Sequence, residues 1–217
     1  MTEMPFKRAR SPQAKARRAD DLLKAAATIL DQQGVEEVTL TRIAARAGVV
    51  KSNVYRYFES REEILLRVLL SDLALMLDAL EQTVQAPISP RRTAELLADG
   101  FASKPRVCLL LTDLAPTLER NIGSEKLREL KRMFLQALDR ATAVLHCAQP
   151  EIKLPGCERI VMAINALVAG LWPMTHPGPV LERVQSEAEF ARLRSDFQEA
   201  LTQNIHALLL GAEAYRS

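Results

Sequence analysis

Apolar residues recur every three to four positions along most of this 217-residue chain, and the breaks between these stretches are short. Such spacing places the apolar side chains on one face of an α-helix, whereas a half-buried strand needs alternation at every second position. No stretch alternates in that way, and only 8 residues are Gly, which argues against turn-rich sandwiches and barrels. We therefore predict an all-α protein of about nine helices.

Capping residues and helix breakers set the expected boundaries of these helices. Ser60 and Glu63 have the spacing of a capping box, and Ser89 with Pro90 forms a helix entrance. Pro116 is expected to end or kink one helix. The predicted helices cover residues 12–33, with Gly34 as the C-cap, and then about 43–46, 51–57, 60–86, 90–103, 105–115, 125–147, 156–172 and 186–210.

The longest stretch without a charged residue, 160–181, is interpreted as a core helix followed by a loop. Its apolar part ends at Trp172 and three prolines follow, so it is not expected to enter a membrane. The first 18 residues lack the apolar segment of a secretory signal, and the three cysteines form no CxxC pair. These features predict a cytoplasmic protein without a disulfide framework.

Positive charge is concentrated near the N-terminus. Residues 1–61 hold 12 Lys or Arg and 7 acidic residues, a net charge of +5, whereas the rest of the chain holds 17 and 20, a net charge of −3. This asymmetry indicates a polyanion partner for the N-terminal part, although a solvated basic tail gives the same pattern. The residues at the N-terminus include a basic tail that either follows a minor groove or adds nonspecific attraction to DNA. The basic residues of this tail are Lys7, Arg8, Arg10, Lys15, Arg17 and Arg18.

Residues 43–54 have the spacing of a helix-turn-helix. Ala44 is small enough for two helices to cross closely, and Gly48 suits a left-handed turn. Ile43 and Val54 are expected to face inward, together with Phe58 at four residues beyond Val54. The segment that starts at Lys51 offers Lys, Ser, Asn, Tyr and Arg side chains on its other face, which are donors to phosphates and base edges.

The whole stretch from Thr39 to Arg61, TLTRIAARAGVVKSNVYRYFESR, resembles the DNA-binding signature of the TetR family of bacterial one-component regulators. Its I-A-x-x-A-G-V and Y-R-x-F elements are specific in combination. The resemblance implies a homodimer, a three-helix DNA-binding domain at residues 1–60, and a divergent domain at 61–217 that holds a ligand and the dimer interface.

Matched by position, several residues resemble the DNA contacts of that family. Arg61 stands where the family usually has Lys and is expected to hold a phosphate. Val50 stands where Ser or Thr is usual, so the recognition helix lacks a side-chain N-cap, a loss of about 1 kcal/mol. The expected DNA contacts are Thr41, Lys51, Ser52, Asn53, Tyr55, Tyr57 and Arg61.

Two segments near the C-terminus carry faces suited to close helix packing. Small residues line one face of residues 156–172, and apolar residues recur at nearly heptad spacing in 186–210. By pattern alone they pack inside one subunit, whereas the family resemblance implies a four-helix dimer interface. The expected interface residues are Ala163, Ala166, Gly170, Leu193, Phe197, Leu201, Asn204 and Leu208.

An effector pocket is expected among the helices between residues 90 and 175, although the same apolar residues could be plain core. Few cationic groups interrupt these segments, which indicates a hydrophobic or aromatic effector and not a phosphate ester. The three His residues are scattered, so neither a metal site nor a cofactor is predicted. The expected pocket residues are Phe101, Cys108, Leu111, Phe134, Leu138, Trp172 and Met174.

Together these features predict a ligand-responsive transcriptional regulator, a repressor that a small effector releases from a palindromic operator. Two alternatives stay open: an architectural DNA-binding protein without an effector, and a helical enzyme or carrier with a basic N-terminus. The sequence contains no GxxxxGK, GxGxxG, GxSxG or HExxH motif and no catalytic pair of carboxylates, so we do not expect an enzyme.

Overall fold

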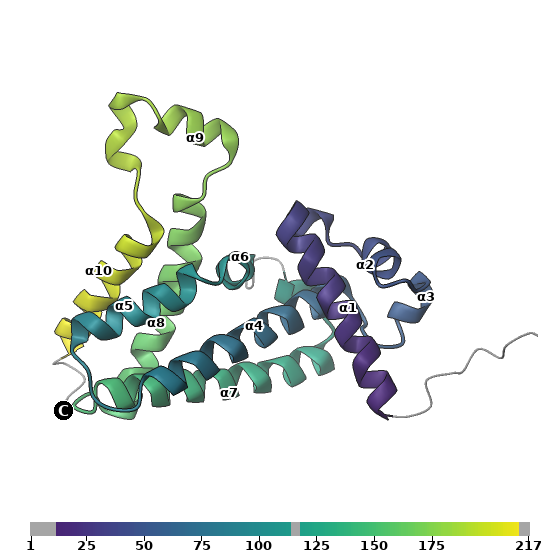
Figure 1. Ribbon diagram of the computed structural model, residues 1–217, viewed down its shortest axis with the longest axis horizontal. Coiled ribbons are helices and arrows are strands. Elements are labelled where there is room, and N and C mark those ends of the chain that lie inside the picture. Colours follow the sequence, from purple (N-terminus) through teal and green to yellow (C-terminus); the bar gives the residue numbers. More distant parts are fainter. Residues whose placement is uncertain (1–11, 114–117, 213–217) are drawn as a thin grey trace, which may run out of the picture. The chain divides into compact units, whose positions relative to one another are not determined.

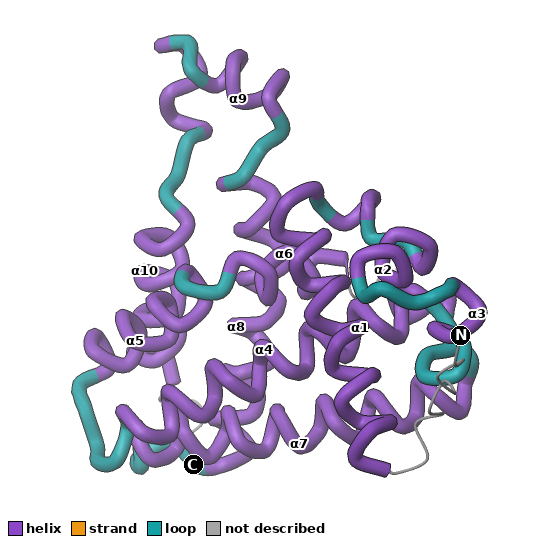
Figure 2. Tube along the Cα trace, turned by 45° about the vertical axis from the view of Figure 1, so that its right-hand side comes forward, coloured by secondary structure: helices purple, strands orange, loops and turns teal. Residues whose placement is uncertain are grey.

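The computed structural model describes residues 12–113 and 118–212. Over these residues the chain is all-α, as predicted, with ten α-helices, a few 3₁₀ turns and no strand (Figure 2). Contacts within the chain divide it into two compact units, Met1–Val68 and Leu69–Ser217. The helix α4 (Arg61–Thr83) begins in the first unit and ends in the second.

The first unit is built from three helices and the start of α4. The first helix, α1 (Pro12–Gln33), has the predicted bounds and ends before Gly34, whose φ of 88° confirms it as a left-handed C-terminal residue. A short 3₁₀ helix η1 (Val35–Glu37) leads to α2 (Leu40–Arg46) and α3 (Lys51–Val54). Leu22 and Ile29 of α1 are buried, as are the inward residues of α2 and α3.

The start of α4 confirms the predicted capping box. The hydroxyl of Ser60 accepts a hydrogen bond from the Glu63 amide at 3.1 Å. The buried carboxylate of Glu63 accepts one from the Glu59 amide at 2.8 Å and a charged one from Arg67 Nε at 2.9 Å. In a standard capping box the Glu63 carboxylate would accept from the amide of the N-cap residue Ser60, but here it accepts from the amide of the preceding residue, Glu59. Arg67 supplies the positive charge that a buried carboxylate needs.

The second unit contains the remaining helices (Figure 1). α10 packs mainly against α5, and α8 packs against α6, α7 and α10. Ser89 caps α5 as predicted, since its hydroxyl accepts from the Arg92 amide at 3.2 Å. The bounds are α5 Pro90–Ala102, α6 Pro105–Asp113, η3 Glu119–Asn121, α7 Ser124–Ala148, α8 Leu154–Thr175, α9 Pro179–Gln185, η4 Ala188–Leu193 and α10 Phe197–Leu210.

Two predictions for the C-terminal part are wrong. One helix over residues 186–210 does not form, because the chain ends η4 at Leu193 and resumes at α10, which Asp196 caps by accepting from the Glu199 amide. The expected loop after Trp172 contains α9, and α8 continues past Pro173 to Thr175. The expected break at Pro116 lies outside the described residues.

The helix α8 also differs from the expected core helix. By length and composition it could cross a membrane, but core helices of soluble proteins pass the same test. Only 28% of its most apolar 18-residue window is buried within the described chain. An apolar helix that its own subunit leaves this open needs another surface to cover it.

Candidate nucleic-acid interface and apolar cavity

The turn between α2 and α3 has the conformation that the sequence predicts. Thr39 caps α2, since its hydroxyl accepts from the Arg42 amide at 3.3 Å. Gly48 has a φ of 65°, which confirms it as the left-handed residue of the turn. The Val49 amide then donates to the Ala44 carbonyl at 2.9 Å, so the chain reverses tightly after α2.

Apolar side chains on the inner side of α2 and α3 hold the two helices in place. Ile43 and Val54 are fully buried, and Ala44 and Phe58 are 3% and 4% exposed. The predicted inward face is therefore confirmed. Because these contacts use one side of α3 only, its other side is left for solvent or a ligand.

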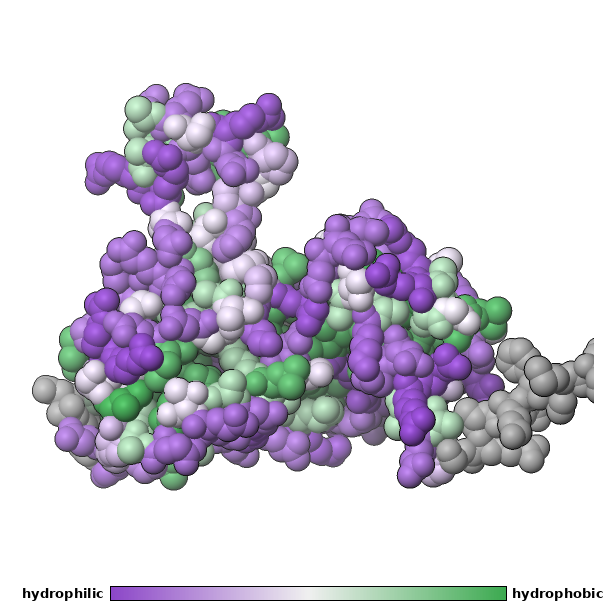
Figure 3. All heavy atoms as spheres, viewed as in Figure 1, coloured by the Kyte–Doolittle hydropathy of each residue, from purple (hydrophilic) through white to green (hydrophobic). Residues whose placement is uncertain are grey.

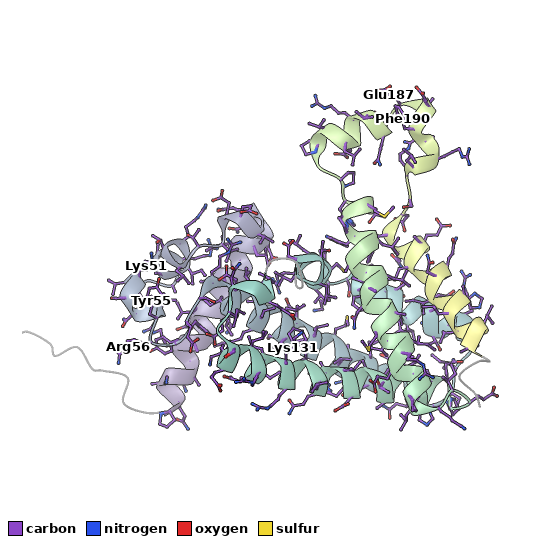
Figure 4. The ribbon with its side chains drawn as sticks, turned by 180° about the vertical axis from the view of Figure 1, so that it is seen from behind. Lys51, Tyr55, Arg56, Lys131, Glu187 and Phe190 are labelled. Atoms are coloured by element: carbon purple, nitrogen blue, oxygen red, sulfur yellow. The ribbon has the colours of Figure 1, made fainter. Side chains whose placement is uncertain are left out.

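That outer side is polar and positively charged. Thr41, Lys51, Ser52 and Arg56 are exposed, Tyr55 is 54% exposed, and Asn53 and Tyr57 are half-buried. Figure 4 shows Lys51, Tyr55 and Arg56 at the surface of α3 and the turn that follows it. Over the part of the chain that the structure describes, Lys51, Arg56 and Arg46 form no ion pair, so their charges are available to an anion.

The helix α3 is shorter than predicted. It ends at Val54, and a turn in which the Tyr57 amide donates to the Val54 carbonyl at 2.9 Å replaces its last three residues. Val50 at the N-cap is 65% exposed and its side chain makes no capping hydrogen bond, as expected. A four-residue helix without a cap has little stability of its own.

Arg61 lies within the packing of the first unit. Its guanidinium donates from Nη2 to the Val35 carbonyl at 2.8 Å, which joins the start of α4 to η1. The expected phosphate contact of Arg61 stays a prediction. Of the basic N-terminal residues, Lys7, Arg8 and Arg10 lie outside the described range, whereas Lys15, Arg17 and Arg18 are exposed on α1.

The second unit contains an apolar cavity of about 170 Å³ that is partly open to solvent. Of the predicted pocket residues, Phe101, Leu111, Phe134 and Leu138 line it. Its other walls come from α4, α5, α7 and α8, and of the lining residues that the structure describes Asn165 alone has a polar side chain. The further lining residues are Leu73, Met76, Leu77, Leu80, Leu97, Ala137, Ala141, Val144, Leu145, Val161, Ile164 and Asn165.

The other three predicted pocket residues lie elsewhere. Cys108 is fully buried with Sγ 3.4 Å from the Phe101 carbonyl, and burial raises the pKa of its thiol to about 12, so the thiol stays protonated. Trp172 stacks on His176 beyond the cavity, with ring centroids 3.6 Å apart. Met174 is 64% exposed. Four of the seven predicted pocket residues therefore line the cavity, whereas Cys108 and Trp172 are buried elsewhere and Met174 is exposed.

Sequence reasoning missed the contribution of α4 and Asn165 to the cavity. Leu73, Met76, Leu77 and Leu80 follow helical spacing, which signals a buried face but not a hollow one. Asn165 is the one polar residue in the apolar stretch 160–174 of the sequence, a signal that marks a position where a side-chain hydrogen bond has a use.

Ion pairs hold α4 against two other helices of this unit. Arg106 of α6 donates to both carboxylate oxygens of Asp72, at 2.6 and 2.8 Å, and the Asp72 side chain is only 8% exposed. Arg140 of α7 pairs with Glu81 at 2.7 Å and with Asp78 at 2.6 Å. The Arg140 hydrogen bond lowers the pKa of Glu81. These bidentate contacts fix the α4 side of the cavity.

An open groove runs between α8 and α10. Ala163, Ala166, Asn204 and Leu208, which were expected at a dimer interface, line it together with Leu167, Ala207 and Gly211. Gly170 is exposed on the same helix. By contrast, Phe197 and Leu201 are 5% and 0% exposed inside the unit, and Leu193 belongs to η4. The expectation for Phe197 and Leu201 is therefore corrected, because both are buried within their own unit, whereas the expectation for Asn204 and Leu208 stays a prediction.

No group of three or more His, Cys, Asp or Glu side chains among the described residues could hold a metal ion. Burial also raises the pKa of the Cys157 thiol. Neither buried thiol has the exposure and lowered pKa of a reactive cysteine.

Comparison with known proteins bears on both units. Residues 22–68 match the family described as bacterial regulatory proteins, tetR family, and residues 66–216 match the tetracyclin repressor-like C-terminal domain. The HTH-type transcriptional repressor KstR2 of Mycolicibacterium smegmatis is 31% identical over 80 residues, 37% of this chain and 39% of that protein. The HTH-type transcriptional repressor BepR of Brucella suis is 29% identical over 130 residues, 53% of this chain and 61% of that protein. The chain thus spans less than two thirds of the length of either relative.

Solved structures share the fold along nearly the whole chain. The fatty acid degradation regulator FadR from Bacillus halodurans has a TM-score of 0.57 at 17% identity, covering 97% of this chain and 100% of that one. FadR from Bacillus subtilis in complex with stearoyl-CoA has a TM-score of 0.56 at 15% identity, covering 89% and 98%. With a C-terminal match over more than half of its residues and an N-terminal match over its helix-turn-helix, this chain belongs to the TetR family of bacterial regulatory proteins.

Proposed function

We propose that the protein is a homodimeric transcriptional repressor that leaves its operator when an apolar small molecule binds in the second unit. The observation that carries this proposal is the combination of two features in one chain. An anchored helix presents unpaired positive charge at its surface, and a separate unit contains a partly open apolar cavity. An architectural DNA-binding protein needs only the first of these features, and a carrier needs only the second.

DNA recognition rests on the outer side of α3. Lys51 and Arg56 supply charge for phosphates, and Ser52, Asn53 and Tyr55 offer hydrogen bonds at the same surface. In a dimer with two-fold symmetry two such helices enter successive major grooves. The operator is then a palindrome or near-palindrome with half-sites about one helical turn apart.

The cavity supports an uncharged effector. Among the described residues its lining holds no charged side chain, and Asn165 can hydrogen-bond one polar group of a ligand. A volume of about 170 Å³ is close to that of an engineered cavity of roughly 150 Å³ that binds benzene. A single ring or a short chain therefore fits as the cavity stands, whereas a long acyl chain such as that of stearoyl-CoA, bound by the Bacillus subtilis relative, needs the cavity to enlarge.

The helix α4 couples the two events in this proposal. It starts directly after the helix-turn-helix and lines the cavity with four residues. An effector releases DNA only if it binds more tightly to the conformer that DNA does not favour. Moving the population from 99:1 to 1:99 takes a preference of about 10⁴-fold. The protein acts in the cytoplasm, without a catalytic step, a cofactor or a membrane partner.

The test is selection of operator sequences from a random pool of duplex oligonucleotides at low ionic strength. We expect a two-fold symmetric consensus, and binding that weakens steeply as salt increases. A folded, paired protein that enriches no sequence contradicts the DNA-binding half of the proposal.

The effector half is tested separately, by thermal unfolding in the presence of single-ring and short-chain apolar compounds. A compound that raises the melting temperature should also release the selected operator. The matched control is Leu138→Arg, which places a charge in the cavity and should abolish the shift in melting temperature while operator binding persists. If no compound stabilises the protein, the architectural alternative is favoured.

A further inference from the structure

The chain between α8 and α10, residues 177–196, forms an arm that its own unit does not cover. No residue of α9 or η4, all of which the structure describes, is buried. The main contact of each of these two short helices is with the other. Figure 1 shows them beyond the ends of α8 and α10, and Figure 4 places Glu187 and Phe190 at the far end.

The arm exposes four large apolar side chains to solvent among its charged residues. Val180, Leu181, Val184 and Leu193 are 68%, 48%, 41% and 63% exposed. Val180 and Val184 are four residues apart in α9 and therefore lie on one face of that helix. In Figure 3 hydrophobic residues interrupt the hydrophilic surface of the arm. A seven-residue helix is marginal in isolation, so an arm of this kind is stabilised by packing against another surface.

The base of the arm, in contrast, is held firmly. Trp172 stacks on His176 with centroids 3.6 Å apart, and Phe197 meets Trp172 edge-on at 5.0 Å. His176 precedes the arm and Phe197 follows it, so this aromatic cluster pins both of its ends together. An element fixed at its base and uncovered along its length is preorganised to bind a partner.

A second copy of this chain is the partner that the surroundings favour. The arm leaves from the ends of α8 and α10, the two helices that carry the open groove lined by Ala163, Ala166 and Leu208. Most residues of the apolar helix α8 are also at least partly exposed to solvent. The exposed apolar residues of the arm therefore extend an exposed apolar surface on α8, and a second copy could cover both. Residues 177–196 contain three Arg, three Glu and Asp196, a net charge of −1, which gives the arm no net attraction for DNA or for an acidic membrane.

We propose that the arm closes over the second unit of a partner copy, so that Val180, Val184 and Leu193 become buried only in the homodimer. This inference rests on the dimer of the proposed function and adds an element to it. The groove between α8 and α10 provides one part of the interface, and the two arms, one from each copy, provide the other.

The test compares the dissociation constant of the full-length dimer with that of two double variants, measured by analytical ultracentrifugation. Val180→Asp with Leu193→Asp should raise the dimer dissociation constant by at least about 100-fold, since each dimer buries two arms. Leu75→Asp with Leu135→Asp changes leucines that are 54% and 58% exposed outside the arm, and should raise it by less than about 3-fold.

A second measurement keeps the inference testable if the arm variant folds poorly. A photo-cross-linking phenylalanine analogue in place of Phe190, in a mixture of light and heavy isotope-labelled chains, should give cross-links that join one light and one heavy chain. Cross-links confined to single chains overturn the inference. An unchanged dimer dissociation constant in the Val180→Asp, Leu193→Asp variant also overturns the inference about the arm. That result does not contradict the homodimer of the proposed function. A full-length chain that stays monomeric overturns both the arm and the dimeric part of the proposed function.

Discussion

The helix α3 in the first unit and the helix α9 in the second are both short and both exposed on one side, yet different contacts hold them. Val54 and Phe58 anchor the α3 segment in a core, and its outer side is polar. No side chain of α9 is buried, and its exposed face includes Val180 and Val184. An exposed polar face on an anchored helix suits a charged ligand such as DNA, whereas an exposed apolar face on an unanchored one suits another protein surface.

The largest expected effect is a loss of stability when an Asp is placed in the anchored α3 segment, compared with an Asp placed in α9. Val54→Asp buries an unpaired carboxylate and should cost the first unit more than about 4 kcal/mol of unfolding free energy. Val180→Asp should change the stability of the monomeric chain by less than about 0.5 kcal/mol. Hydrogen exchange of peptides from α1–α3 and from α9, at concentrations where the chain is monomeric, measures both. Equal losses would contradict the difference in anchoring.

The base of the arm should respond strongly to truncation, in contrast to its tip. Phe197→Ala removes a ring that is 5% exposed and should destabilise the second unit by about 3 kcal/mol. Phe190→Ala, at a half-buried position at the tip, is the matched control and should cost less than about 1 kcal/mol. Urea unfolding followed by the fluorescence of Trp172, the single tryptophan, reports on this unit. Similar costs for both variants would mean that the arm is packed along its whole length.

Substitutions on the outer side of the α3 segment should affect DNA binding and leave pairing intact. Tyr57→Ala should weaken operator binding by roughly 100-fold, because it removes an expected phosphate contact and part of the surface that supports it. Lys51→Ala should weaken binding to all sequences and reduce the salt slope by about one.

The control for both is Arg132→Ala, an exposed basic residue of α7. Fluorescence anisotropy with the selected operator measures affinity, and ultracentrifugation checks the dimer. An unchanged operator affinity in Tyr57→Ala would refute the assigned role of that residue.

The smallest effect is expected at the N-cap of α3. Val50 has β-region backbone angles, φ −79° and ψ 148°, that suit a serine cap. Val50→Ser should stabilise the first unit by about 0.5–1 kcal/mol, whereas Val50→Ala, which supplies no cap, should not. Thermal unfolding measures the difference. Suppose that the Val50→Ser variant also binds the operator more tightly by the same free energy. The first turn of α3 is then disordered in the free natural chain and becomes ordered when the chain binds DNA.

The helix-turn-helix was predictable because its determinants are local. Gly48 at a positive φ and Ser60 in a capping box each act over a few residues, so their roles follow from residue type and spacing. The inward positions Ile43 and Val54 followed from helical periodicity in the same way. The length of α3 was overestimated, because beyond Val54 the amides of Arg56 and Tyr57 bond three residues back and only the Phe58 amide bonds four residues back, so the chain forms a turn that keeps helical spacing.

The second unit was less predictable because its features depend on contacts between distant segments. Phe197 and Leu201 share an apolar pattern with Leu208, but packing against α5 decided that the first two lie inside the subunit. The residues of the cavity come from five helices, and no spacing within one helix reports a hollow between several.

Periodicity and capping, which are written into short stretches of chain, therefore determined that this protein is all-α and that its N-terminal part carries a helix-turn-helix. Only the tertiary structure decided which apolar faces are buried, where the cavity lies and that residues 177–196 leave the body of their unit. The physical reason is that backbone conformation is selected by neighbours along the chain, whereas burial is a sum over contacts between residues far apart in sequence.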